Sequence, residues 1–83
     1  MFYVYVLINK DGKLYISQTS DINRRIEEHN FTGNGYTSKY RPWKLVCKKE
    51  FLKRKDAMKE ERRLKSGVGR DWIKNFIDLN DVG

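Results

Sequence analysis

The chain has 83 residues, the size of one domain, and its single cysteine and single histidine exclude an internal disulfide and a Cys/His zinc cage. We expect no membrane span, since no stretch approaches roughly 18 consecutive apolar residues, and no export signal, so the predicted location is cytoplasmic. Lys and Arg number 18 against 11 Asp and Glu, and the net charge of +7 indicates an anionic partner.

A β-hairpin is the first predicted element. Residues 2–8 are all aromatic or aliphatic, three of them β-branched, and a second short run covers residues 13–18. The sequence Asn-Lys-Asp-Gly at 9–12 favours a type I turn with a left-handed glycine, which is the three-residue loop that ends in a G1 bulge. In that register Tyr5 and Tyr15 are diagonal neighbours on one face of the sheet. A two-residue Asp-Gly turn would place them on opposite faces.

A helix is predicted over about residues 21–30. Residues 19–21 offer N-cap oxygens, and three residues recur with helical spacing: Ile22, Ile26 and His29. Arg25, four residues before His29, must lie on a neighbouring turn of the same face. Residues 30–42 contain two glycines and no apolar period, which predicts a loop.

The second half of the chain predicts a strand and two helices. Residues 43–51 read as a third strand, residues 55–66 as a helix, and residues 69–79 as a short amphipathic helix. The expected apolar face of the first of these helices consists of Ala57, Met58, Leu64 and Val68. Glu61 falls inside this stripe, where the periodicity favours an apolar residue. The predicted element order is ββαβαα, an α/β (α+β) fold.

Basic residues are concentrated after the first strand pair, and tyrosines and Trp43 are interleaved with them. Lys and Arg neutralise phosphates and aromatic rings stack on unpaired bases, so this mixture favours nucleic acid as the partner. The alternative is a solvated charged surface without a dedicated ligand. Charge alone does not separate DNA from RNA.

Five polar residues break or flank an apolar pattern: Tyr5, Tyr15, Arg25, His29 and Glu61. Together they could form a metal-assisted phosphodiester hydrolase. A carboxylate holds a hard cation such as Mg²⁺, the cation polarises the phosphate, and a guanidinium takes up the developing charge. Water must also lose a proton, and tyrosine, with a usual pKa of about 10, needs neighbours that favour its phenolate.

Motifs spread over most of the chain match a known family. Tyr3-Val4-Tyr5 is followed, after nine residues, by Tyr15-Ile16-Ser17 and then by Asp21-Ile22-Asn23-Arg24-Arg25 and Glu28-His29-Asn30. The match continues through Tyr36-Thr37, Arg41-Pro42, Leu45-Val46 and Ala57-Met58-Lys59-Glu60-Glu61. These motifs resemble the GIY-YIG nuclease domain, and in particular the small stand-alone bacterial GIY-YIG proteins.

The resemblance implies a three-stranded antiparallel sheet flanked by helices, with the active site on one sheet face. Tyr5 and Tyr15 would position or activate water. Arg25 would be the catalytic arginine, and His29 would assist at the phosphate or the base. Glu61 would be the single protein ligand of one divalent cation, Mg²⁺ or Mn²⁺.

Nucleic acid is the implied partner, and we expect DNA in preference to RNA. The residues expected to contact it are Ser17, Arg24, Tyr36, Lys39, Arg41 and Lys65. The chain has no room for a separate targeting domain, so a protein partner or a feature of the substrate would supply specificity. We expect a monomer or a weak dimer.

Two positions depart from the family pattern. Tyr3 stands where the first signature has glycine, a substitution that the small stand-alone group generally shows. Ser17 stands where the second signature has glycine, and in the predicted register it faces Tyr5. Added side-chain atoms there can hinder close approach by a phosphate. An alternative function is therefore a catalytically impaired module that binds nucleic acid on the same fold. A third is a small protein-interaction domain whose basic face meets an acidic partner.

The individual residues also have structural alternatives. Tyr5 and Tyr15 can be a packed cross-strand pair of aromatics. Arg25 can pair with Asp21 four residues earlier, as Arg24 can with Glu28 four residues later. His29 can cap the end of its helix, where the helix dipole favours a cation.

Overall fold

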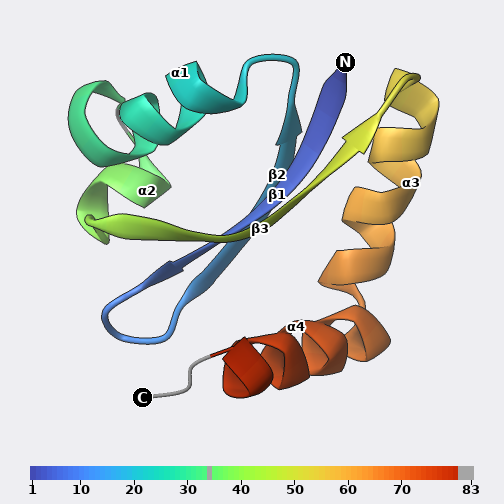
Figure 1. The fold of residues 1–83 in the computed structure, drawn as a ribbon. Helices are drawn as coiled ribbons and strands as arrows, with labels where there is room; N and C mark the ends of the chain where they lie inside the picture. The colour runs from blue at the N-terminus through green and yellow to red at the C-terminus, as the bar shows by residue number, and fades with distance from the viewer. Residues whose placement is uncertain (34, 81–83) are drawn as a thin grey trace.

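The computed structural model describes residues 1–33 and 35–80 and contains an antiparallel sheet of three strands (Figure 1). Strand β1 (Phe2–Asn9) lies in the middle, between β2 (Leu14–Thr19) and β3 (Trp43–Phe51). Both neighbours run antiparallel to β1. The expected hairpin, the expected third strand and the expected sheet are all confirmed.

The hairpin turn sets which tyrosines share a face. Gly12 has a φ of 81°, and its N–H donates to the Asn9 carbonyl at 3.1 Å, as the three-residue loop requires. Tyr5 consequently lies opposite Ser17, and Leu7 lies opposite Tyr15. The rings of Tyr5 and Tyr15 have centroids 6.4 Å apart, so the predicted diagonal pair is confirmed.

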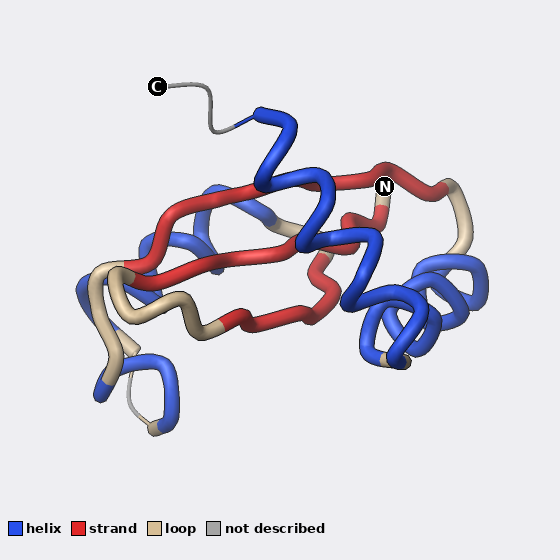
Figure 2. The backbone as a smooth tube through the Cα atoms, turned by 90° about the horizontal axis from the view of Figure 1, so that it is seen from below, coloured by secondary structure: helices blue, strands red, loops and turns tan. Residues whose placement is uncertain are grey.

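The two faces of the sheet carry different helices (Figures 1 and 2). Val4 and Val6 point to one face and pack with buried residues of α3 (Arg54–Lys65) and α4 (Gly67–Asn80), which crosses the strands. Tyr5 and Leu7 point to the opposite face because side chains in a strand alternate. There they pack with Ile22 of α1 (Ile22–Glu27) and with Trp43. Each face therefore has its own apolar cluster.

The segment between β2 and β3 is more ordered than the sequence predicts. Helix α1 ends at Glu27 and continues as a π-helical turn, η1 (Glu28–Thr32), and a short helix follows, α2 (Tyr36–Lys39). The prediction of a plain loop over residues 30–42 was therefore wrong. So was the single helix over residues 21–30, since His29 belongs to the π-helical turn. Side chain to backbone bonds, which leave no periodic pattern, hold this segment.

Part of the predicted apolar face of α3 was also wrong. Ala57 and Leu64 are buried, but Met58 is 42% exposed and Val68 is 76% exposed. Val68 lies in the turn that begins α4, where Gly69 approaches α3 so closely that an added Cβ would overlap the Arg63 carbonyl oxygen. That close approach fixes the turn and leaves Val68 facing solvent. Within the described residues, no helix is both long and apolar enough to cross a bilayer.

A partly buried carboxylate, Glu60, links α3 to β3. It accepts hydrogen bonds from Lys49 Nζ at 2.6 Å and from Arg63 Nε at 2.5 Å. The bond from Arg63, followed by that from Lys49, lowers the pKa of Glu60 to about 2 despite its partial burial. The folded state therefore favours the ionised carboxylate, and its contribution to stability is present above the ordinary pKa and lost as pH falls toward 2.

We expect Glu60→Gln to lower the free energy of unfolding at pH 7 by about 1 kcal/mol, since both cations are partly exposed and screened. Between pH 5 and 3 the wild type should lose stability faster than the variant, because only the wild type has this carboxylate to protonate. Urea unfolding at several pH values measures both effects. Glu50→Gln, at an exposed position on β3, is the matched control. Parallel pH dependence in wild type and Glu60→Gln would contradict the assignment.

Candidate active site

A cleft of about 170 Å³ opens on the sheet face that carries α1, η1 and α2. Its walls come from four elements, β2, α1, η1 and α2, and the described residues that line it are Tyr15, Arg25, Glu28, His29, Gly33, Tyr36 and Thr37. Three of the predicted catalytic residues and the predicted binding residue Tyr36 are among them. The fold thus brings together side chains that are far apart in the sequence.

Tyr5 lies beneath the cleft rather than in its wall. It is fully buried, and its hydroxyl lies 2.8 Å from His29 Nε2. The His29 ring is 4.9 Å from the Tyr15 ring in an edge-on arrangement and 5.8 Å from the Tyr5 ring, measured between centroids. The three rings form one cluster in which only Tyr15 and His29 reach the cleft.

The environment keeps both members of the Tyr5–His29 pair uncharged at neutral pH. Burial, followed by the electrostatic effect of nearby Tyr15, raises the pKa of Tyr5 to about 12. The positive charge of Arg25 and a hydrogen bond from Ser17 oppose this shift but do not cancel it. Burial and the charge of Arg25 lower the pKa of His29 below its usual value. Neither phenolate nor imidazolium is therefore favoured at this position.

Arg25 is held by Glu28, which the sequence analysis paired only with Arg24. Its Nη1 lies 3.1 Å from Glu28 Oε2, while Arg24 Nε lies 3.0 Å from Glu28 Oε1. The predicted pair of Arg24 with Glu28 is confirmed, whereas the alternative pair of Arg25 with Asp21 was wrong. Asp21 instead caps α1, its carboxylate accepting from the backbone N–H of Arg24. The spacing of Glu28, three residues after Arg25, was the available signal.

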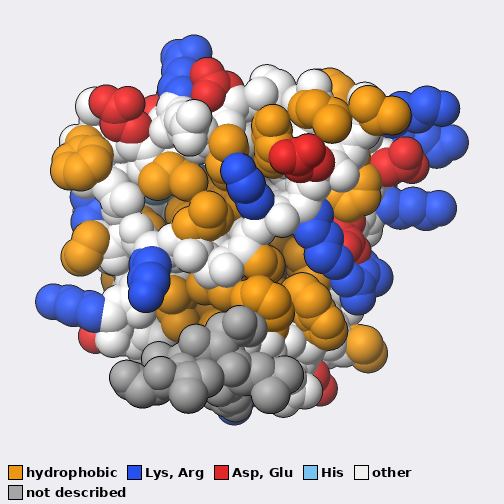
Figure 3. All heavy atoms as spheres, viewed as in Figure 1, with side chains coloured by type: hydrophobic (Ala, Val, Ile, Leu, Met, Phe, Trp, Pro, Cys, Tyr) orange, Lys and Arg blue, Asp and Glu red, His pale blue; other side chains and the backbone are white. Residues whose placement is uncertain are grey.

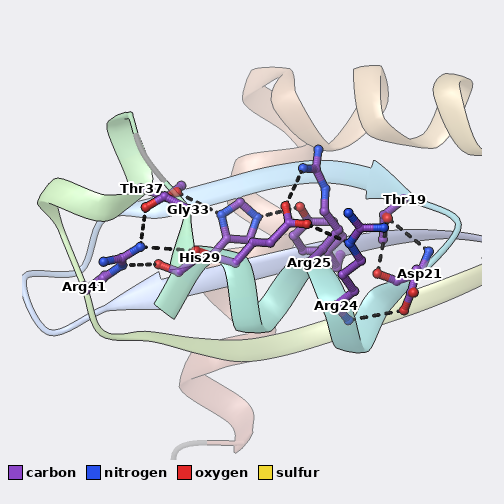
Figure 4. A network of polar contacts seen from close by, with 10 residues as sticks. Thr19, Asp21, Arg24, Arg25, His29, Gly33, Thr37 and Arg41 are labelled. Carbon is purple, nitrogen blue, oxygen red and sulfur yellow. Dashed lines mark hydrogen bonds and ion pairs between the residues drawn. The ribbon is translucent and has the colours of Figure 1, made fainter. Parts of the chain in front are cut away.

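His29 does not cap the end of a helix, so that alternative was wrong. The ring is buried, and its Nδ1 lies 2.9 Å from Thr37 Oγ1 in addition to the Tyr5 contact at Nε2 (Figure 4). Thr37 is buried as well. The sequence analysis missed Thr37 as a functional residue, because a threonine in a glycine-rich segment carries no periodic signal.

Two side chains fix the backbone around the cleft, and Figure 4 shows the bonds of one of them, Arg41. Arg41 donates from Nε to the His29 carbonyl at 2.8 Å and from Nη2 to the carbonyls of Glu28 and Gly33. Asn30 bonds both to the backbone N–H of Trp43 at 2.6 Å and to its carbonyl at 3.0 Å. Contact of Arg41 with nucleic acid stays a prediction, while its observed bonds shape the cleft wall.

The other predicted binding residues occupy different places. Ser17 is partly buried opposite Tyr5, and Tyr36 is 53% exposed at the cleft with its ring 4.9 Å from that of Tyr40. Lys39 ends α2 and is exposed. On the face drawn in Figure 3, Lys and Arg side chains are spread among acidic and hydrophobic ones rather than gathered into one patch.

Glu61 lies on α3, away from the described lining of the cleft. Its side chain is 22% exposed, and Lys65 Nζ lies 3.1 Å from Oε2. Glu61, which falls inside the predicted apolar stripe, is therefore partly exposed and paired. Its negative charge is close enough to be among the causes that raise the pKa of Tyr5, although it is the smallest of them.

The donor set around Glu61 fits a hard cation and not zinc. Among the described residues, no three His, Cys, Asp or Glu side chains gather as ligands. Mg²⁺ usually keeps several waters and binds through one or two carboxylates and substrate phosphates, so one glutamate is sufficient. Glu61 would then hold Mg²⁺ or Mn²⁺ in place of its ion pair with Lys65.

Comparisons with known proteins agree on one family. The profile of the GIY-YIG catalytic domain matches residues 1–75. A UPF0213 protein of Streptococcus agalactiae is 42% identical over 65 residues, which are 76% of this chain and 73% of the relative. A UPF0213 protein of Bacillus pumilus is 39% identical over 79 residues, 93% of this chain and 74% of the relative. The solution NMR structure of a UPF0213 protein from Bacillus halodurans matches with a TM-score of 0.55 at 33% identity, covering 96% of this chain and 86% of that one. The chain belongs to the GIY-YIG catalytic domain family and is similar to its small bacterial UPF0213 members.

Proposed function

We propose that this protein hydrolyses phosphodiester bonds in nucleic acid, with DNA as the preferred substrate and one divalent cation as cofactor. The observation that carries the proposal is the convergence of Tyr15, Arg25 and His29 on one small cleft. A guanidinium, a hydroxyl and an imidazole in one cleft suit a single phosphate group and its attacking water.

Arg25 is assigned to the scissile phosphate. Its planar guanidinium gives one bond, from Nη1, to the Glu28 carboxylate, and the fork of a guanidinium can bind two oxygens of a phosphate. The same positive charge offsets the negative charge that develops on the phosphate oxygens during displacement. A divalent cation held by Glu61 would polarise the phosphate and stabilise the leaving oxygen.

Tyr15 is assigned to the attacking water, because its ring lines the cleft while Tyr5 is buried below. The pKa of Tyr5, raised to about 12, disfavours a Tyr5 phenolate as the base. Tyr5 instead holds His29 through the bond at Nε2. His29 is neutral and hydrogen-bonded, so among the three rings of Tyr5, Tyr15 and His29 it is the one that can accept a proton.

A cleavage assay tests the proposal. Purified full chain is incubated with supercoiled, branched and single-stranded DNA, and with RNA, in Mg²⁺ or Mn²⁺. We expect nicking or cleavage of DNA that stops when EDTA is added, because the cation is required for the chemistry. The absence of turnover on every substrate with either metal would overturn the proposal.

A second candidate function rests on Ser17, which lies opposite Tyr5 where the family signature has glycine. In this case the protein binds nucleic acid without cutting it. Binding would weaken steeply with salt, as phosphate contacts do, in the absence of turnover. Gain of cleavage in Ser17→Gly would identify the added side chain as the cause.

A further inference from the structure

The chain contains one histidine, and the structure places hydrogen-bonding partners at both of its ring nitrogens. Thr37 Oγ1 lies 2.9 Å from Nδ1, and the Tyr5 hydroxyl lies 2.8 Å from Nε2. The three residues come from β1, η1 and α2, and all three are buried. In a buried chain of hydrogen bonds of this kind, each polar atom needs a partner of the right type, so the donor in one bond determines the donor in the next.

The direction of the chain follows from its members. A neutral imidazole has one N–H and one acceptor nitrogen, so the two ring contacts must run the same way along the chain. Tyr5 remains a phenol, and a phenol O–H is a stronger donor than a neutral imidazole N–H, while an unprotonated ring nitrogen is a stronger acceptor than a phenol oxygen. The Tyr5 O–H is then directed at Nε2, which leaves the ring proton on Nδ1 to be donated to Thr37.

The Thr37 hydroxyl oxygen can accept from Nδ1–H, and the bonds around its backbone hold Thr37 in place to do so. Its carbonyl accepts from Trp43 Nε1 at 2.8 Å, and Trp43 is itself buried and bonded to Asn30. Arg41 ties the carbonyl of His29 to that of Gly33, which lies four residues before Thr37. Neither the threonine nor the ring can move without breaking several of these bonds (Figure 4).

We propose that Thr37 is a positioning residue that fixes His29 as the Nδ1–H tautomer, with Nε2 as the acceptor facing Tyr5. Its catalytic meaning rests on the proposed function. With Nε2 unprotonated, His29 can take up the proton that the attacking water releases. The water O–H bond breaks as the Nε2–H bond forms, hydroxide is left to attack the phosphate, and the resulting imidazolium keeps its Nδ1–H bond to Thr37.

The tautomer can be read directly, because a single histidine gives a single pair of ring nitrogen signals. Full-length protein labelled with ¹⁵N is measured at neutral pH. We expect Nδ1 to be protonated and Nε2 unprotonated in the wild type. In Thr37→Val, which removes the acceptor but keeps the shape, we expect the Nε2–H tautomer to become populated. Thr37→Ser should restore the wild-type pattern, and Thr32→Val, at an exposed threonine of η1, should leave it unchanged.

A predominant Nε2–H tautomer in the wild type would overturn the inference, and this measurement does not depend on how well any variant folds. An unchanged tautomer in folded Thr37→Val would also overturn it. Where the wild type cuts DNA, kcat should fall about tenfold in Thr37→Val and recover in Thr37→Ser. An inactive wild type with the expected tautomer would reject the nuclease proposal and leave the role of Thr37 in orienting the ring in place.

Discussion

Replacing Arg25 with alanine is expected to lower the rate of DNA cleavage by about 10²–10³-fold, the usual effect of removing one group that stabilises a developing oxyanion. Arg25 is the arginine that lines the cleft, and its guanidinium lies beside the negative charge of Glu28. Without it, Glu28 would present an unopposed carboxylate to the incoming phosphate, which adds repulsion to the lost attraction. The measurement is kcat and KM on the preferred substrate at fixed salt.

Two further variants separate geometry from charge. Arg25→Lys keeps the positive charge but loses the planar fork, so it should recover only part of the lost rate. Lys10→Ala removes one positive charge at the exposed hairpin turn and should leave kcat unchanged. A similar loss in Arg25→Ala and Lys10→Ala would show that Arg25 contributes only to the overall attraction of nucleic acid.

The sheet and its shared tyrosine face were predictable because local rules determine them. Strand residues alternate between two faces, and the Asn-Lys-Asp-Gly turn selects one register, so Tyr5 and Tyr15 had to lie on the same face. The helical spacing of Arg25 and His29 likewise directed both toward one side. These predictions depend only on neighbours within a few residues or on one hairpin.

The walls of the cleft could not be predicted in the same way. The π-helical turn and α2 are held by Arg41 and Asn30, whose partners are backbone groups 8 to 13 residues away. Such bonds leave no repeating pattern in the sequence, so a glycine-containing segment looked like a loop. The same limitation hid Thr37, whose importance comes from its distance to one ring nitrogen.

The pairing of the charged residues on α3 was the other feature that the sequence analysis did not predict. Glu61 falls inside the apolar stripe of α3, where the periodicity favours an apolar residue, and Lys65 one turn later supplies it with a partner. Adjacent Glu60 is the more buried carboxylate, with its side chain 12% exposed, and it is engaged by two cations of its own. Two neighbouring glutamates thus differ in the partners that a metal would have to displace.

That difference leads to the expectation that Glu61→Gln abolishes metal-dependent cleavage, with a loss of about 10³-fold or more. A metal that stabilises transition-state charge contributes several kcal/mol, and each 1.36 kcal/mol corresponds to about tenfold in rate. Glutamine keeps the size of the side chain and removes the negative charge that a hard cation requires. The wild type should bind Mn²⁺ measurably by calorimetry or electron paramagnetic resonance, and Glu61→Gln should bind it much more weakly.

Glu60→Gln is the matched control, because it makes the same substitution one residue earlier on the same helix. It should retain Mn²⁺ binding and cleavage, since Lys49 and Arg63 already neutralise that carboxylate, while losing stability. The measurements are made at temperatures below the unfolding transition of both variants, so that unfolding is not mistaken for weaker metal binding. Equal Mn²⁺ affinity in the wild type and Glu61→Gln would remove Glu61 as the metal ligand, whatever the cleavage assay shows. Loss of Mn²⁺ binding in Glu61→Gln but not in Glu60→Gln would place the cation at Glu61, the carboxylate whose charge contributes to the raised pKa of Tyr5.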